Sequence, residues 1–469
     1  DDGGLSGLYR LLVKIGRLDE ACALLADSRP LQPLELWPLR YRAEDLADHG
    51  RYAEAAGIYA RALELRPDDA ELLARRGACL WELGRRDEAL ALWDRALEIQ
   101  PNLTWVADYR RTLEQGPAVE QFDAPFAYDV YELIDAWEEQ DPEAAAEYLL
   151  DQEIIKVNSD GTSSRVVHRV IKLKRPEALQ DFGYGYFTYI PDEETYEVRH
   201  MRVIRSDGTE LEATDFGEYS RSDVESRMYH DEYTRYAPLP GIEVGAVIDI
   251  EYRLDQVGEN IYQGNFSDIF VFGNYEPTML SEYIVLTPAD YPLYSHLQNG
   301  AGVEILDGAD DAVDQRVIRR RAEDLPRIKN EPYAPPLAEI LPLSVVSNFD
   351  SWSELGRWWW RLSAETLEPD TAVRELAAEL TADAETPFEK LTAIYDYVTN
   401  EIRYVAILLG IGGWKPLDNE RCLNAGYGDC KATAALMISL LDAVDIEAYP
   451  VFVRTQGLGR LDWEQPAIG

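Results

Sequence analysis

The stretch "GYGDCKATAALM", residues 426–437, decides how the C-terminal part of this chain folds. Gly428 and Asp429 supply a turn, and aspartate is a favourable N-cap residue. From Cys430 to residue 445 the sequence contains no glycine or proline, and small or apolar side chains occur on almost every helical face. The pattern predicts a buried, central helix that begins at Cys430.

Cys430 is predicted to lie in the first turn of this helix. Free N–H groups and the helix dipole favour an anion there, which would lower the pKa of the thiol. A thiolate is a nucleophile for covalent acyl transfer, and the first-turn N–H groups would be available to an oxyanion. The residues alone leave a second interpretation open, in which Cys430 only packs at the start of a core helix.

The residues before this stretch predict further helices. Thr386-Pro387-Phe388-Glu389 has the form of a capping box with proline at the first helical position. The tryptophans at 358–360 are predicted to belong to a core or a domain interface rather than to a binding platform. Cys422 is placed in a polar loop, and residues 446–455 ("IEAYPVFVRT") are predicted to form a strand.

The middle of the chain has the alternating pattern of strands. In "GIEVGAVIDIEYRL", residues 241–254, apolar and acidic side chains alternate as in a half-buried strand. Asp160-Gly161 and Asp207-Gly208 separate alternating runs and predict hairpins. We therefore expect an antiparallel β-sandwich-like domain over about residues 140–335, entered through a short helical segment around residues 128–150.

Four histidines fall in this β-rich segment, and three of them lie near predicted strands. His168, His200 and His230 have no partners at metal-ligand spacing, so they are interpreted as residues on sheet faces. No metal site and no cofactor is expected.

The N-terminal part is repetitive with a period of 34 residues. One copy carries Gly50, Tyr52, Ala55, Tyr59, Ala62 and Pro67, and the next carries Gly84, Arg86, Ala89, Trp93, Ala96 and Pro101. A partial copy precedes them, with Gly16, Leu18, Ala21, Leu25 and Pro33. Small residues let paired helices approach, an aromatic ring fills the space between them, and proline ends the second helix.

These motifs resemble known families. The repeats are similar to tetratricopeptide repeats, which commonly hold a peptide or partner protein on a concave surface. "YVAILLGIGGWKP" and "GYGDCKATAALMISLLDAVDIEAYPVFVRT" resemble the bacterial branch of the transglutaminase-like, papain-related cysteine fold. "SRVVHRVIKL", "VIRSDGTELEATDF" and "YAPLPGIEVGAVIDIEY" look like the domain of unknown function that often precedes such cores.

The resemblance implies a multidomain fold class: an all-α tetratricopeptide solenoid, the β-sandwich-like domain and an α+β transglutaminase-like core that is incomplete here. The expected bounds are 1–115 for the repeats, 116–140 for a linker with a helix, 140–335 for the β-rich domain and 345–469 for the core.

The same resemblance implies the site residues. Cys430 corresponds to the nucleophile, with Gly428, Asp429 and Lys431 as supporting residues. A His and then an Asp normally follow on later strands, but the last histidine of this chain is His296. Both partners are therefore expected after Gly469, and residues 1–469 alone are expected to show no turnover. Relatives often carry Asp-Lys where this chain has Ala432-Thr433.

Charge and composition exclude some classes of function. The chain has 469 residues, with 87 acidic against 45 basic ones and a net charge of −42. Such a field repels nucleic acid and anionic surfaces. No apolar run is long enough to span a bilayer. The chain begins at Asp1 without methionine, so a periplasmic and a cytoplasmic location both stay open.

Three functional hypotheses follow. The first is a thiol protease, amidase or transamidase that forms a thioester at Cys430 and docks a protein or peptide through its repeats. The second is a non-catalytic scaffold that keeps the transglutaminase-like fold for protein interactions. The third is a sugar-binding or envelope-associated β domain. A disulfide between Cys422 and Cys430 would silence the site of the first hypothesis.

Overall fold

The computed structural model contains two compact units, Asp1–Gln121 and Phe122–Gly469. The structure describes residues 8–9, 11–13, 17–27, 36–48, 51–83, 85–100, 103, 106, 121–191, 193–223, 226–258, 260–310, 315–329, 331–453 and 465–467. Each unit is described by itself.

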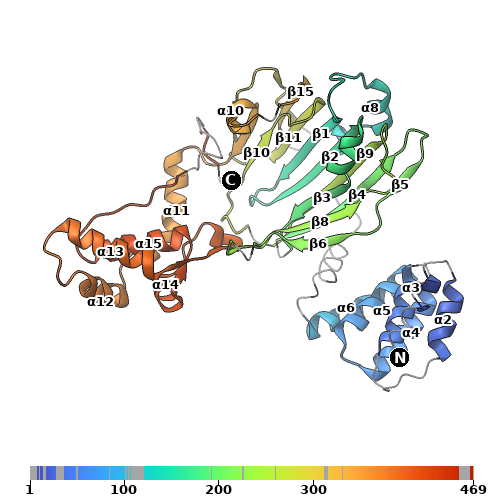
Figure 1. Ribbon diagram of the computed structural model, residues 1–469, viewed down its shortest axis with the longest axis horizontal. Helices are drawn as coiled ribbons and strands as arrows, with labels where there is room; N and C mark the ends of the chain where they lie inside the picture. Colours follow the sequence, from blue (N-terminus) through green and yellow to red (C-terminus); the bar gives the residue numbers. More distant parts are fainter. Residues whose placement is uncertain are drawn as a thin grey trace. The chain divides into compact units, whose positions relative to one another are not determined.

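The first unit consists of paired helices (Figure 1). They are α2 (Leu18–Asp27), α3 (Trp37–Asp48), α4 (Tyr52–Leu65), α5 (Ala70–Glu82) and α6 (Arg86–Ile99). The helix pairs confirm the repeat pattern. A Cβ atom added to Gly77 would lie 2.6 Å from the indole of the buried Trp93, whose Nε1 donates to the carbonyl of Ala74 at 3.0 Å. Only glycine lets these helices approach so closely.

The second unit begins with a large β-rich part. Its strands are β1 (Ala146–Val157), β2 (Ser163–Leu173), β3 (Tyr184–Tyr189), β4 (Glu194–Ile204), β5 (Glu210–Glu212), β6 (Gly217–Ser220), β7 (Met228–His230), β8 (Tyr233–Pro238), β9 (Val247–Gln256), β10 (Ser267–Val271), β11 (Thr278–Pro288), β12 (Tyr294–Gln298), β13 (Val303–Ile305), β14 (Gly308–Asp310), β15 (Gln315–Leu325) and β16 (Leu343–Ser347). Its helices are η1 (Ala124–Phe126), α8 (Val130–Ala136), α9 (Pro176–Asp181) and α10 (Leu337–Ile340).

The largest described sheet has nine strands in the order β13-β15-β11-β1-β2-β9-β4-β5, with β14 paired to β15 (Figure 1). The predicted hairpins are present: Gly161 and Gly208 adopt φ angles of 78° and 83° in the β1–β2 and β4–β5 connections. The sheet is mixed rather than wholly antiparallel, because β1 and β11 run parallel. Because these two strands are far apart in the sequence, no local sequence pattern predicts that they pair.

Two small sheets give this part its sandwich-like character. The sheet β3-β8-β6 contributes Phe187 and Ala237 to a core with Ile250 of the large sheet. The sheet β10-β16-β12 contributes Phe270 to a second core with Tyr283. The fold class expected from the sequence is thus confirmed in outline, with a large mixed sheet as its main layer.

The three sheet histidines lie in strands, as predicted. His168 in β2 is buried, and its Nε2 lies 2.9 Å from a carboxylate oxygen of Asp249 in β9. His200 lies opposite Glu251, also in β9, and His230 lies opposite Leu408. Among the residues that the structure describes, no group of three or more His, Cys, Asp or Glu side chains is arranged to hold a metal ion.

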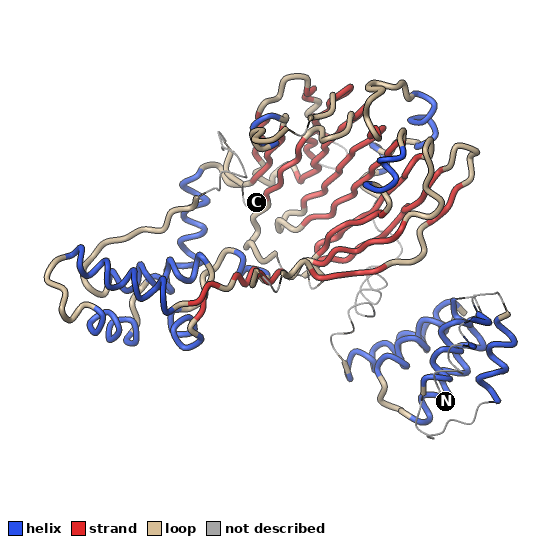
Figure 2. Tube along the Cα trace, viewed as in Figure 1, coloured by secondary structure: helices blue, strands red, loops and turns tan. Residues whose placement is uncertain are grey.

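The α+β core follows at the C-terminal end of the second unit (Figure 2). Its elements are α11 (Trp352–Leu367), α12 (Thr371–Leu380), α13 (Pro387–Glu401), β17 (Arg403–Tyr404), β18 (Ala406–Leu408), η2 (Gly410–Gly413), α14 (Asn419–Ala425), β19 (Tyr427–Gly428) and α15 (Cys430–Asp442). The capping box at Thr386 and Glu389 is present at the start of α13. None of the described helices is long and apolar enough to cross a bilayer.

Three local predictions need correction. Residues 446–453 form no strand, because no described strand pairs with them; Tyr449 and Val451 are exposed. The helix expected around residues 128–150 is confined to α8, and β1 already begins at Ala146. Cys422 lies in the helix α14 and is fully buried, not in a polar loop.

The tryptophan stripe is a core element, as expected. Trp358 and Trp359 of α11 are buried with Ala435 of α15, whereas Trp360 is exposed. Trp359 also donates its Nε1 hydrogen to the carbonyl of Trp414 at 3.0 Å. The stripe therefore fixes α15 against α11 and against the loop that contains Trp414.

Candidate active site

The predicted capped helix start at Asp429 and Cys430, here called the nucleophile turn after its predicted role, is present at the start of α15. Asp429 is the N-cap, and its side chain accepts hydrogen bonds from the N–H groups of Lys431 at 3.0 Å and Ala432 at 2.9 Å. Cys430 is the first residue of the helix and is exposed to solvent. The helix behind it is buried through Ala432, Leu436 and other apolar residues, as the sequence pattern predicted.

Lys431 and Asp429 form an ion pair with largely buried side chains. A buried pair of this kind costs desolvation, which is offset only when both charges are well placed. Here the carboxylate serves both the ammonium group and the helix N–H groups. These two predicted supporting residues therefore hold the turn that presents Cys430.

The first-turn N–H groups were expected to be available to an oxyanion, and the geometry agrees with this expectation only in part. The N–H groups of Lys431 and Ala432 are occupied by Asp429 and are not available to a ligand. The N–H of Cys430 itself is not bonded to the cap side chain and therefore stays a candidate donor to an oxyanion.

Tyr404 is a site residue that the sequence pattern did not reveal. Strand β17 pairs with β19 and places Tyr404 opposite Gly428, close to the nucleophile turn. Burial, together with the nearby Cys430 thiol, raises the pKa of the Tyr404 hydroxyl. A tyrosine at the end of a short apolar run carries no local signal for such a contact, because the contact depends on strand pairing.

The two cysteines of the core differ in environment. Cys430 is exposed, whereas Cys422 is fully buried, and both are free thiols, so the disulfide considered from the sequence is not formed. Burial, reinforced by the nearby Asp429, raises the pKa of Cys422 to about 11. Cys422 is therefore a core residue.

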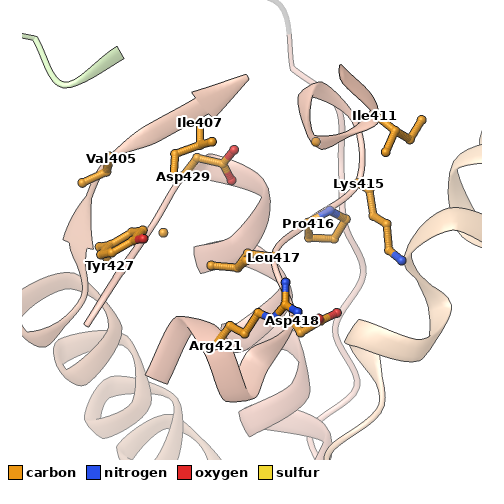
Figure 3. A pocket seen from close by; sticks show the side chains of 12 residues that line it. Val405, Ile407, Ile411, Lys415, Pro416, Leu417, Asp418, Arg421, Tyr427 and Asp429 are labelled. Carbon is orange, nitrogen blue, oxygen red and sulfur yellow. Dashed lines mark ion pairs between the residues drawn. The ribbon is translucent and has the colours of Figure 1, made fainter. Parts of the chain in front are cut away.

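A pocket of about 230 Å³ opens beside the nucleophile turn (Figure 3). It is lined by Val405, Ile407, Ile411, Gly412, Lys415, Pro416, Leu417, Asp418, Arg421, Tyr427, Gly428 and Asp429. The lining includes the two residues that precede Cys430 but not Cys430 itself. Such a pocket can hold a mainly apolar group next to the thiol.

Gly428 is needed for steric reasons. A Cβ atom at this position would lie 2.9 Å from Cβ of Ala432 and 3.1 Å from Sγ of Cys422. We expect Gly428→Ala to lower the free energy of unfolding of the second unit by about 1–3 kcal/mol, because the turn must shift away from α15. Urea unfolding monitored by tryptophan fluorescence measures this change.

The matched control is Gly356→Ala. Gly356 lies within α11, and a Cβ atom there meets nothing within 4 Å. Alanine should therefore stabilise this helix slightly. Equal effects of the two substitutions would contradict the steric explanation for Gly428.

No His–Asp pair is hydrogen-bonded to the Cys430 thiol in the described part of the chain. None of the described histidines forms a hydrogen bond or ion pair with Cys430; His168 is engaged with Asp249 instead. The described residues thus provide an exposed thiol, a cap and a pocket, but not the His and Asp that the resemblance implies.

Comparison with known families assigns all three parts. Tetratricopeptide repeats match residues 46–126, the domain of unknown function DUF3857 matches residues 159–329, and the transglutaminase-like superfamily matches residues 374–463. No curated protein matches the chain.

One solved structure agrees with these assignments at the level of the fold. A protein from Parabacteroides distasonis, described as a "putative protease", matches with 20% identity and a TM-score of 0.56 over 65% of this chain and 59% of its own. The chain thus spans less than two thirds of that protein. The first tetratricopeptide domain of Spaghetti (RPAP3), solved with an HSP90 peptide, matches 24% of this chain and 88% of its own at 24% identity and a TM-score of 0.22. The three family matches show that the chain combines tetratricopeptide repeats, a DUF3857 domain and a transglutaminase-like core.

Proposed function

We propose that this protein is a cysteine acyl-transfer enzyme of the protease, amidase or transamidase type, with Cys430 as its nucleophile. The observation that carries the proposal is the exposed Cys430 at the first position of α15, beside a pocket of about 230 Å³. A buried packing cysteine would not be solvent-exposed at this place; Cys422, which does pack, is fully buried.

In the proposed reaction the Cys430 thiolate attacks the carbonyl carbon of an amide. A C–S bond forms, the C–N bond breaks, and a general acid donates a proton to the leaving amine. Water or a second amine then attacks the thioester and regenerates the thiolate. In keeping with the resemblance, we propose that a His and an Asp from residues after Gly469 supply the acid/base function.

The repeats suggest a protein or peptide as the substrate or docking partner. Tetratricopeptide arrays commonly bind peptides on their concave surface. The net charge of −42 disfavours nucleic acid as a ligand. A non-catalytic scaffold is the alternative function, and it is favoured by the lack of a described histidine in contact with Cys430.

The test of the nucleophile is an alkylation experiment on the 469-residue chain. We expect iodoacetamide at about pH 6 to modify Cys430 at least about tenfold faster than the same cysteine in a synthetic peptide of residues 426–437, because the peptide lacks the stable helix N-terminus. Mass spectrometry of digests resolves the four cysteines. Cys422 is not a suitable reference, because its burial alone slows modification.

Two outcomes separate the hypotheses. If Cys430 in the folded chain reacts no faster than in the peptide, the thiol is not activated, and the scaffold hypothesis is favoured. Faster reaction supports the enzyme, and turnover is then measured in a chain that extends beyond Gly469.

A further inference from the structure

One extended stretch, Arg403–Leu408, lies between the nucleophile turn and the β-rich part of the second unit. Its first half, β17, pairs parallel with β19, and the N–H of Val405 donates to the carbonyl of Gly428 at 3.0 Å. Its second half, β18, pairs parallel with β7, and the N–H of Ala406 donates to the carbonyl of Arg227 at 3.0 Å. Consecutive N–H groups in an extended chain point to opposite sides, so this stretch is bonded to both neighbours at once.

A second contact follows directly. The N–H of Gly410, at the start of η2, donates to the carboxylate of Asp231, the residue after β7. A hydrogen bond from an amide to a carboxylate is stronger than one between neutral groups. Ile407 of β18 and Ile411 of η2 both line the pocket beside Cys430. One wall of the pocket is therefore held at two places by the β-rich part.

The segment that makes these contacts is an extension of the hairpin between β6 and β8, here called the bridging hairpin (residues 221–223 and 226–232). Two backbone hydrogen bonds join its two sides. The N–H of Arg221 donates to the carbonyl of Glu232 at 3.0 Å, and the N–H of Met228 donates to the carbonyl of Asp223 at 2.8 Å. The hydroxyl of Ser222 also accepts a hydrogen bond from the N–H of His230 at 2.9 Å. The hairpin is thus built into the β-rich part and reaches the core with the edge of β7, which pairs with β18.

We propose that the bridging hairpin is a positioning element of the active site, and that this is a role of the domain of unknown function. This inference rests on the proposed function, since it concerns the pocket beside Cys430. Asp231 is a positioning residue: it acts on the pocket wall through Gly410 and touches no reacting atom. The pocket keeps its shape because β7, β18 and Asp231 hold residues 405–412 in place.

The test compares Asp231→Ala with Asp231→Asn and with Glu232→Gln. Asparagine keeps an acceptor oxygen for Gly410, and Glu232 is the adjacent carboxylate, which pairs with Arg221 instead. Two readouts are used: amide hydrogen exchange in residues 405–412, and the ratio of Cys430 alkylation rates with N-benzyl iodoacetamide and iodoacetamide. The two reagents share one leaving group, and only the first carries a group that fills an apolar pocket.

Alkylation is run at about pH 9, where even an unactivated thiol reacts, so the ratio is measurable whether or not Cys430 is a catalytic nucleophile. We expect Asp231→Ala to speed amide exchange in residues 405–412 by about tenfold. It should also lower the benzyl preference, which is the rate with N-benzyl iodoacetamide divided by the rate with iodoacetamide, by about threefold or more. Asp231→Asn should recover most of both values, and Glu232→Gln should change neither. Exchange in α12 serves as the internal reference for intact folding.

An unchanged benzyl preference in Asp231→Ala, with or without faster exchange, would overturn the inference. So would equal effects of Asp231→Ala and Glu232→Gln. Neither result depends on turnover, so a failure of this inference is distinct from a failure of the proposed enzyme function.

Discussion

Cys430→Ser is expected to lower amide turnover by about 10⁴-fold or more in a chain that carries the complete site. Catalytic residues that act together lose nearly all of their effect when the nucleophile is removed. Serine keeps the size of the side chain and its place at the start of α15, so the helix and its cap should remain. The loss should therefore appear in kcat/KM without a change in the unfolding transition.

Two assays check this expectation with defined probes. Fluorophore-labelled casein reports hydrolysis, and incorporation of dansylcadaverine into casein reports transamidation. Together they also distinguish water from an amine as the acceptor of the thioester. Cys22→Ser is the matched control, since Cys22 is a partly exposed thiol in the first unit. Retained turnover in Cys430→Ser would remove Cys430 from the reaction.

Asp429→Ala is expected to lower the free energy of unfolding of the second unit by about 2–4 kcal/mol. The substitution removes both hydrogen bonds of the N-cap, to the N–H groups of Lys431 and Ala432. It also leaves the largely buried Lys431 ammonium without its carboxylate. Urea unfolding monitored by the fluorescence of Trp358 and Trp359, which pack against α15, measures the change.

Asp429→Asn separates the two contributions. Asparagine is an equally good N-cap but carries no charge, so the expected loss is about 1–2 kcal/mol. Adding Lys431→Met to Asp429→Asn should recover part of this loss, because no buried charge is then left unpaired. If asparagine and alanine proved equally destabilising, the cap hydrogen bonds would contribute nothing.

Much of the site's local structure follows from neighbouring residues. Asp429 caps α15 because a short acceptor side chain before an apolar helical run satisfies the first N–H groups. Gly428 precedes it because no Cβ fits against Ala432. Cys430 follows as the first helical residue. The sequence predicted the Asp429 cap and the helix start at Cys430, since each depends on residues within one helical turn, whereas the steric reason for Gly428 came from the structure.

Other site features depend on pairing between distant residues. Tyr404 reaches Cys430 only because β17 pairs with β19, and Asp231 reaches Gly410 only because β7 pairs with β18. Short strands of two or three residues carry too few side chains for a period to be read. The first-turn N–H groups were expected to be free, and the structure shows that the cap side chain itself occupies two of them.

The sequence by itself determined the repeat helices, the Asp-Gly hairpins and the capped helix that presents Cys430, because periodicity, turn residues and caps act over a few neighbouring positions. Only the tertiary structure decided that β1 and β11 run parallel, that residues 446–453 form no strand with any described partner, and that a hairpin of the β-rich part holds the wall of the pocket. Each of these depends on which distant segments come together, and their free energy comes from packing and strand pairing that no local pattern records.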